Sequence, residues 1–222
     1  MRLLGKNVTN IKMKHLKLSL FGGKEKDFSG LELALRTDST ELKGVQIGGV
    51  NYVEKKVEGV QIGGVNVVEG DANGVQAGVF NCAGEEVRGV QSGVWDYTQF
   101  MKGVQIGGIN YVEKYVKGVQ AGVFNIAGEE VNGVQVSQFL NCAEKVNGVQ
   151  VSQFLNLAGK VNGVQAGIIN LAGEKMRGVQ ISALYNICTR DSRGVQIGLL
   201  NHSYGAQWYK RYLPLIAIRT GK

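Results

Sequence analysis

Apolar and polar residues recur along most of this chain in a pattern that repeats about every fifteen residues. The tripeptide Gly-Val-Gln opens each repeat, and the spacing of successive copies is fifteen except for one of fourteen and one of sixteen. The opening residues of the eleven copies are Gly44, Gly59, Gly74, Gly89, Gly103, Gly118, Gly133, Gly148, Gly163, Gly178 and Gly194. Gly30 opens a degenerate twelfth copy. A period this short and regular indicates a stacked repeat architecture.

Individual positions of the repeat accept only certain residue types. The second position is always Val, the fourth is small or aliphatic, and the fifth is Gly or Ser. The seventh position is large and apolar: Val50, Val65, Phe80, Trp95, Ile109, Phe124, Phe139, Phe154, Ile169, Leu184 and Leu200. A further apolar column stands just before the next Gly: Val57, Ala72, Val87, Met101, Val116, Val131, Val146, Val161 and Met176. We expect these apolar columns to form continuous internal stacks.

Two amide columns accompany the apolar ones. An Asn, replaced once by Asp96, follows at the eighth or ninth position: Asn51, Asn66, Asn81, Asn110, Asn125, Asn141, Asn156, Asn170, Asn186 and Asn201. Asn tolerates left-handed backbone, which suits a corner, and stacked Asn side chains can form a ladder of amide hydrogen bonds. Strict alternation places the Gln of Gly-Val-Gln on the face opposite Val and Ile, which favours an exposed Gln ladder over a buried one.

Fifteen residues are too few for a helix pair but are enough for two strands of about five residues and two tight turns. The opening Gly suits a corner that needs positive φ or close approach of the backbone. The sequence therefore predicts an all-β, single-domain β-solenoid of about twelve coils, with ~15 residues per coil. The competing topology is an antiparallel meander of hairpins. Half of a repeat is too short for the ~9–11 residues that a membrane-spanning strand needs.

The ends of the chain differ from the repeats and are expected to cap the solenoid, because exposed strand edges invite aggregation. We expect an N-terminal cap at residues 1–28, the repeat solenoid at 29–201 and a C-terminal cap at 202–222. The first cap contains a strand-like run, Leu16 to Phe21. The second contains aromatic and basic residues from Trp208 to Pro214.

Composition and charge argue against several classes of function. Gly is frequent (33 residues), Pro occurs once, and 44% of residues are hydrophobic, which is consistent with tight turns around a core. The net charge of +7 resides in the two ends, because residues 44–201 carry twelve basic and thirteen acidic residues. Nucleic-acid binding through a basic stripe is therefore not expected. No apolar run reaches the ~20 residues of a membrane helix, and Met1 to Ser29 shows no signal peptide.

Cysteine and histidine, which commonly act in catalysis and metal binding, are few in this sequence and far apart. Cys82, Cys142 and Cys188 lie several coils apart, too far for an internal disulfide, and their spacing fits no zinc site. The two histidines, His15 and His202, stand near opposite ends of the chain. We expect no catalytic residue, no metal site and no cofactor, and hence no enzyme.

Acidic pairs occur between the Asn column and the next Gly, as in Glu85-Glu86 and Glu129-Glu130. Paired carboxylates can hydrolyse glycosides, but one of them must then lie in an apolar pocket. A repeated edge that faces solvent offers no such pocket. We therefore expect a solvated charge ladder.

Four tyrosines lie in the same turn region, namely Tyr52, Tyr97, Tyr111 and Tyr115. Aromatic side chains on an edge can bind sugar rings or a protein partner. They can equally pack over the corner. These tyrosines are the candidate ligand- or partner-binding residues.

The repeat Gly-Val-Gln-x-Gly-x-x-Asn resembles that of the bacterial surface repeat-containing proteins first named from leptospires. The opening segment from Leu16 and the closing segment from Gly194 to Leu215 also look like those of that family. The resemblance implies an exported or surface-associated protein without a known enzymatic activity. The expected function is a non-catalytic structural or interaction protein with a protein or glycan partner. The alternative is a carbohydrate- or matrix-binding adhesin that uses the turn region containing the four tyrosines. A further expectation is that two copies can pair end to end.

Overall fold

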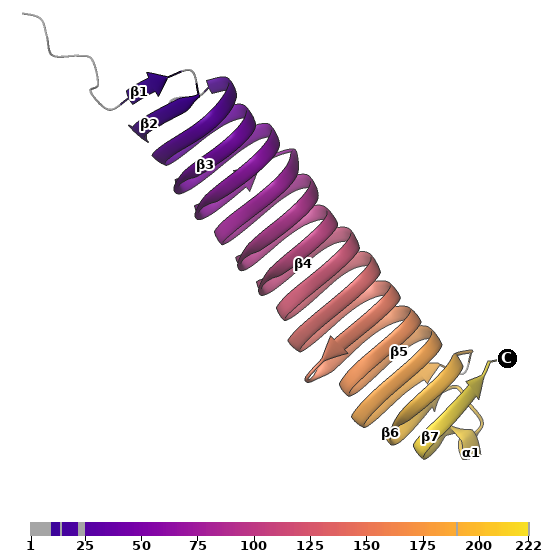
Figure 1. The fold of residues 1–222 in the computed structure, drawn as a ribbon. Coiled ribbons are helices and arrows are strands. Elements are labelled where there is room, and N and C mark those ends of the chain that lie inside the picture. The colour runs from indigo at the N-terminus through magenta and orange to yellow at the C-terminus, as the bar shows by residue number, and fades with distance from the viewer. Residues whose placement is uncertain (1–9, 14, 22–24, 190, 222) are drawn as a thin grey trace, which may run out of the picture. The chain divides into compact units, whose positions relative to one another are not determined.

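The computed structural model describes residues 10–13, 15–21, 25–189 and 191–221 (Figure 1). Residues 1–9, 14 and 22–24 of the expected N-terminal cap, and residue 222 of the C-terminal one, lie outside this range. The elements are β1 (Asn10–Met13), β2 (Leu16–Phe21), β3 (Glu25–Val68), β4 (Asp71–Ser152), β5 (Leu155–Thr189), β6 (Arg193–Tyr204), α1 (Trp208–Arg211) and β7 (Tyr212–Thr220). The strand expected at Leu16 to Phe21 is β2.

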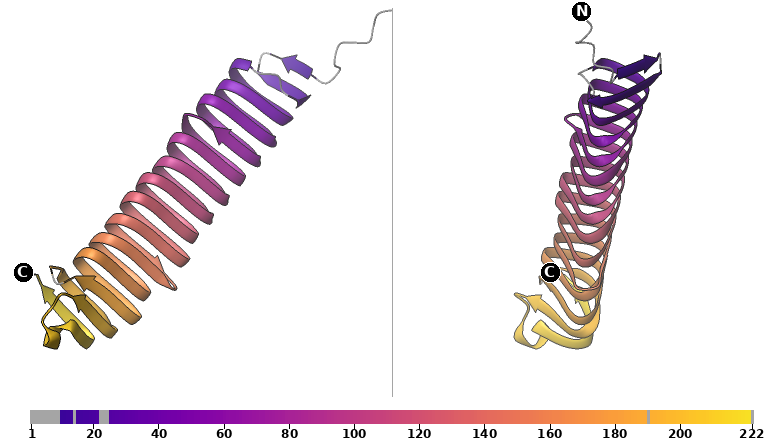
Figure 2. Two further views of the ribbon diagram at one scale, coloured as in Figure 1. Left: turned by 180° about the vertical axis from the view of Figure 1, so that it is seen from behind. Right: turned by 90° about the vertical axis from the view of Figure 1, so that its left-hand side faces the viewer.

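Strand pairing confirms the β-solenoid. The long strands wind through several flattened turns each (Figure 2). Neighbouring turns pair in parallel with each residue opposite its equivalent in the next repeat, so that Gly59 lies beside Gly74 and Gly148 beside Gly163. The antiparallel meander is therefore wrong. Twelve described glycines, Gly30 and the eleven openers of Gly-Val-Gln, have φ between 133° and 151°, one for each coil.

The chain divides into two compact units, unit 1 (Met1–Gln99) and unit 2 (Phe100–Lys222). Both are built from the same coil. At the start of unit 1, β1 pairs antiparallel with β2, and at the end of unit 2, β7 pairs antiparallel with β6. The terminal strands thus reverse the direction of pairing at both ends of the chain.

The interior of each coil is filled mainly by four columns of side chains. Two are the apolar column before the opening Gly and a small column two residues after the Asn, which contains Val53, Val68, Ala83, Val112, Ala127, Ala143, Ala158, Ala172 and Cys188. The other two are the Gln and Asn columns, whose described members are at most 1% exposed. The expected exposed Gln ladder is therefore wrong. The expected internal stack at the seventh position is also wrong, because Phe80, Trp95 and Phe139 are about half exposed.

Size explains why the seventh position points outward. A coil of fifteen residues encloses a narrow interior, and the buried apolar columns range only from Ala to Met. The seventh position includes Phe80, Trp95 and Phe139, which are larger than any residue of those buried columns and do not fit a close-packed interior of that width. Gln fits the interior because its amide is satisfied by the equivalent Gln of the neighbouring coil, so that no buried polar group is left unpaired.

The Gln ladder has a direction. Each Nε2 donates to the Oε1 of the preceding coil, for example Gln61 to Gln46 at 3.0 Å and Gln165 to Gln150 at 2.8 Å. In unit 1 the ladder begins at the carboxylate of Glu32, which accepts from Gln46 at 3.1 Å. Glu32 is in turn paired with the buried Lys17 at 2.6 Å. The carboxylate of Glu32 thus accepts a hydrogen bond from the N–H end of the Gln column, where the aligned amide dipoles favour a negative charge.

In unit 2 the ladder ends at a cation. The guanidinium of the buried Arg219, on β7, donates from Nε to Oε1 of Gln196 at 2.8 Å. Its remaining nitrogens donate to the backbone oxygens of Lys210 at 2.8 Å and Asn201 at 3.3 Å. Arg219 therefore satisfies the acceptor end of the Gln column and ties β7 to β6.

The Asn ladder runs the other way. Asn51 donates from Nδ2 to Oδ1 of Asn66 at 2.7 Å and also to the backbone oxygen of Ile62 at 2.9 Å. At its start, Thr37 donates its hydroxyl to Oδ1 of Asn51 at 3.1 Å. No described Asn has positive φ, since Leu215 is the one non-glycine residue with positive φ among the described residues. The Asn column therefore serves side-chain pairing, and the expectation of left-handed Asn corners is wrong.

Replacing Arg219 with Met is expected to lower the free energy of unfolding by about 2 kcal/mol, because it removes a charge-assisted hydrogen bond and leaves Oε1 of Gln196 unpaired. Urea unfolding followed by circular dichroism would measure the loss. Arg177→Met, at an exposed position, is the matched control and is expected to change stability little. Equal stability of the two variants would contradict the proposed capping role.

Candidate functional site

The two halves of the repeat differ sharply in charge. The first seven positions of the eleven Gly-Val-Gln copies contain no Asp, Glu, Lys or Arg, and the charged residues follow after the Asn column. Because Gln at the third position points inward, the second and fourth positions point outward. Each unit therefore has an apolar face, which we define as the second, fourth, sixth and seventh positions of its coils.

Much of the apolar face is open to solvent. In unit 1 its most exposed residues are Ile47, Val50, Ile62, Val79, Phe80, Val94 and Trp95. In unit 2 they are Ile106, Phe124, Val136, Phe139, Val151, Phe154, Ile169, Ile181, Leu184, Ile197 and Leu199. An exposed apolar surface of this extent is typical of an interaction site.

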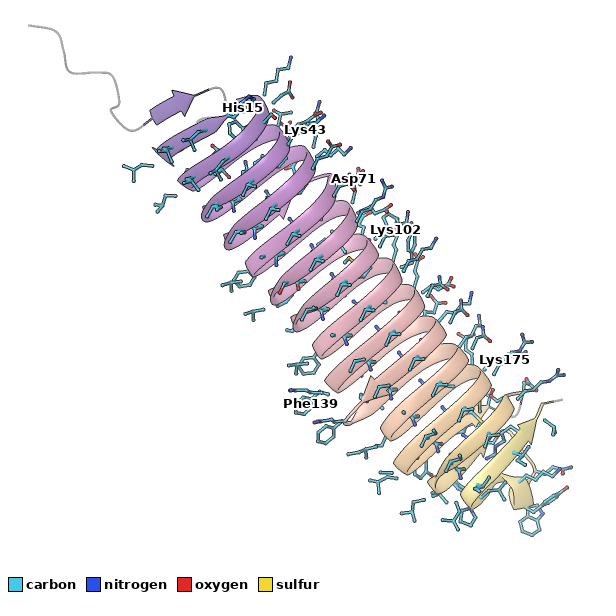
Figure 3. The ribbon with its side chains drawn as sticks, in the orientation of Figure 1. His15, Lys43, Asp71, Lys102, Phe139 and Lys175 are labelled. Atoms are coloured by element: carbon cyan, nitrogen blue, oxygen red, sulfur yellow. The ribbon has the colours of Figure 1, made fainter. Side chains whose placement is uncertain are left out.

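A stack of three phenylalanines forms the most prominent part of the face in unit 2. The ring centroids of Phe124 and Phe139 are 5.8 Å apart with an angle of 18° between the planes, and those of Phe139 and Phe154 are 5.0 Å apart at 2°. Figure 3 shows Phe139 on one edge of unit 2, with Lys102 and Lys175 on the opposite edge. In the coils of Phe139 and Phe154 one extra residue precedes the Asn, which enlarges this corner.

The opposite edge carries the charged residues, which pair between neighbouring coils. Lys145 contacts Glu130 at 3.1 Å and Lys160 contacts Glu174 at 3.0 Å. The Lys145 ammonium lowers the pKa of Glu130, the opposite of what a general acid needs. Pairs this exposed contribute little to stability. In the other acidic pair, Glu85-Glu86, the carboxylate of Glu86 forms an ion pair with Arg88 at 2.8 Å. This arrangement matches the expected solvated charge ladder.

Within unit 1 the two candidate tyrosines lie apart from each other. In unit 1, Tyr52 donates its hydroxyl to Glu69 at 2.5 Å, which raises its pKa to about 12. Tyr97 lies three coils further along the same column, with Val67 and Cys82 between them.

In unit 2, Tyr115 packs against Phe100, with ring centroids 4.6 Å apart, and Lys117 lies 5.5 Å from the centre of its ring. Tyr111 is half-buried in the column just after the Asn. The binding role of the four tyrosines stays a prediction.

Cysteine and histidine side chains occupy structural positions. The three cysteines are free, and burial raises the pKa of each thiol, which keeps it in the unreactive protonated form. His15 is exposed, whereas His202 is buried and stacks on Tyr212 with ring centroids 4.4 Å apart. Burial lowers the pKa of His202. It belongs to the packing between β6 and β7.

Within the described ranges, no three His, Cys, Asp or Glu side chains are placed to hold a metal ion. None of the helical residues described here forms a helix long and apolar enough to cross a membrane.

One carboxyl group is buried in the Asn column. Asp96 takes the place of Asn in unit 1, where it accepts from Nδ2 of Asn81 at 2.7 Å, and its Oδ2 is buried without a hydrogen-bond partner. Burial raises its pKa to about 6.

The apolar face includes the seventh position, which hydrophobicity alone predicts to be interior. Two signals in the sequence point to it, namely the wide range of sizes at the seventh position and the absence of charge from the first half of the repeat. Comparison of the chain with protein families, with curated proteins and with solved structures finds no match.

Proposed function

We propose that this protein is a non-catalytic structural or interaction protein of the bacterial envelope or surface, which binds its partner through the apolar face. The observation that carries this proposal is the division of each coil into a charge-free half and a charged half. Depletion of charge is the compositional mark of the core of protein interfaces. The envelope or surface location rests on the resemblance of the repeat to the bacterial surface repeat proteins.

Energetics support a binding role for this face. Each exposed apolar side chain that is covered by a partner contributes about 25 cal/mol per Å² of area removed from water. A regular solenoid presents these side chains on a rigid backbone, so that little conformational entropy is lost when the partner binds. The charged edge stays hydrated, because its Lys and Glu residues already pair with each other.

Cysteine labelling in the cells that produce the protein would test the proposal. The native cysteines are first replaced by residues that occur elsewhere in their own columns, as Cys82→Val, Cys142→Leu and Cys188→Ala. Val151→Cys then reports on the apolar face, and Glu144→Cys, on the charged edge, is the matched control. We expect a maleimide to label position 144 fully and position 151 at least five-fold less, relative to the urea-unfolded protein.

Equal labelling of the two positions would mean that the face is uncovered in its native setting and would contradict the proposal.

The location is tested separately by adding protease to intact cells, with a cytoplasmic protein as the control. Digestion on intact cells supports a surface position. Complete protection until lysis would reject it.

A further inference from the structure

We propose that the partner on the apolar face is a second copy of this chain, and that two copies pair face to face with their solenoid axes antiparallel. This inference rests on the proposed function, since it names the partner of the same surface. It is argued from unit 2, whose seven coils open at the glycines from Gly103 to Gly194.

The first argument is the area of the face. The two-fold axis argued below sets five coils of unit 2, those that open from Gly103 to Gly163, against the same coils of the second copy. Five coils at ~4.8 Å each give a length of roughly 24 Å, and five residues of strand give a width of roughly 16 Å. Two such faces in contact bury on the order of 800 Å² before the corrugation of the side chains is counted, an area typical of a weak, reversible dimer.

The second argument is chemical. The face has no Lys or Arg to contact lipid phosphates, and it has no charge of either sign to select a charged partner. Its second and fourth positions are Val, Ile and Ala, the residues that fill the core between two packed β-sheets, whereas the sixth position includes the exposed Gln138 and Gln153. A second copy has the same spacing between its rows, so its side chains meet the face in register over the paired coils.

The third argument is the order of sizes. Over the first five coils of unit 2 the fourth position runs Ile106, Ala121, Val136, Val151, Ala166, and Ile181 and Ile197 follow in the last two coils. A two-fold axis beside Val136 sets Ile106 of one copy against Ala166 of the other and Ala121 against Val151. Large residues then face small ones.

The same axis lies beside Phe139, the middle ring of the phenylalanine stack. Antiparallel pairing about this point sets Phe139 against Phe139 and Phe124 against Phe154, so that large residues face small ones at the fourth position and aromatic rings face aromatic rings at the seventh. An isologous interface of this kind is the commonest arrangement in homodimers.

The apolar face also continues onto β7. Ile216 lies opposite Ile197 and Ile218 opposite Val195, and residues directly opposite in a sheet share a face. Ile216 and Ile218 are 61% and 73% exposed. The C-terminal strand thus extends the apolar face of unit 2.

Sedimentation equilibrium of the purified full-length protein tests the dimer. We expect a dimer at about 50 µM, and at least a ten-fold weaker association when Val136→Lys and Val151→Lys are combined. Both positions point outward, so the fold is retained, which circular dichroism checks. Asn162→Lys adds a charge at an exposed position on the charged edge and is expected to remain dimeric.

Three outcomes would overturn the inference: a wild-type monomer, a dimer that is unaffected by the two lysines, or a monomer that co-sediments with phosphatidylcholine–phosphatidylglycerol vesicles through Val136 and Val151. The last would identify a lipid surface as the partner. A monomer whose position 151 is nevertheless protected in cells would leave the proposed function standing and reject only the second copy.

A cross-link tests the position of the axis. In the cysteine-replaced protein, Val136→Cys is expected to form a disulfide with the same residue of the second copy under mild oxidation. Ile197→Cys, four coils away, would be separated from its counterpart by about 38 Å and is expected not to cross-link. Cross-linking at 197 but not at 136 would reject the antiparallel arrangement.

Discussion

Replacing Gly148 with Ala is expected to lower the free energy of unfolding by about 4 kcal/mol, the largest effect of any single substitution considered for this protein. Gly148 has φ of 147°, a conformation that residues with a side chain rarely adopt. A Cβ there would overlap the carbonyl oxygen of Gly133 in the preceding coil. The clash is with backbone that is fixed by parallel pairing, so neither coil can move away without breaking the sheet.

Gly173 provides the matched control. An added Cβ at Gly173 meets its nearest neighbours at 3.7 and 3.8 Å, and this residue has no positive φ. Gly173→Ala is therefore expected to change stability by less than about 0.5 kcal/mol. Urea unfolding of both variants would measure the difference. A loss in Gly148→Ala no greater than that in Gly173→Ala would show that the opening glycines are not needed for the turn.

Replacing Asp96 with Asn is expected to stabilise the protein by about 3 kcal/mol at pH 8, because a shift of about two pKa units corresponds to about that free energy. Asp96 is fully buried in a column of amides, and its Oδ2 has no hydrogen-bond partner. Asn keeps the oxygen that accepts from Asn81 and removes the buried charge. Urea unfolding at several pH values would measure the gain.

The pH dependence of this gain follows from the direction of the pKa shift. The pKa of Asp96 rises from 3.8 in the unfolded chain to about 6 in the folded protein, so the folded state binds the proton more tightly. The destabilisation is therefore absent below about pH 3.8, grows as the pH rises, and is complete above about pH 6. The difference between Asp96→Asn and wild type should shrink to nearly zero by pH 4. A difference that is independent of pH would exclude ionisation of Asp96 as its cause.

The period of the repeat was sufficient to predict the fold. Parallel stacking brings equivalent residues together, so the fifteen-residue spacing from Gly59 to Gly74 appears directly as strand register. The positive φ of the opening glycines also followed from the sequence, because Gly is the residue that such a turn requires. Local chemistry and periodicity decide these features, and both can be read from one chain.

Which side of the strand faces inward could not be decided by hydrophobicity. At the strand Gly-Val-Gln-Ile-Gly, ordinary transfer free energies favour burying Val45 and Ile47 and exposing Gln46. In the structure Gln46 is buried, Ile47 is exposed and Val45 is half-buried. Burial of Gln46 depends on hydrogen bonds to Gln61, Glu32 and Ser39, which come from other parts of the sequence. The cost of burying an amide vanishes only when such partners are present.

The separation of Tyr52 from Tyr97 in unit 1 has a related cause. Tyr52 and Tyr97 share a column, but the coils between them carry Val67 and Cys82, so stacking separates the two rings. Position in the repeat predicts the side of the coil on which a residue lies. It does not predict a platform unless adjacent repeats carry the same residue type, as Phe124, Phe139 and Phe154 do.

The fixed polarity of the Gln and Asn ladders has a consequence for how such a protein can change length. Each Gln donates one hydrogen bond to the coil before it and accepts one from the coil after it, as Gln150 does with Gln135 and Gln165. Duplication or deletion of fifteen codons therefore still places each Gln beside a Gln and each Asn beside an Asn, and creates no new kind of contact. A partial repeat would set an amide against an apolar side chain. Genetic growth of this protein should thus proceed in whole coils, while Glu32 and Arg219 serve as its two fixed ends.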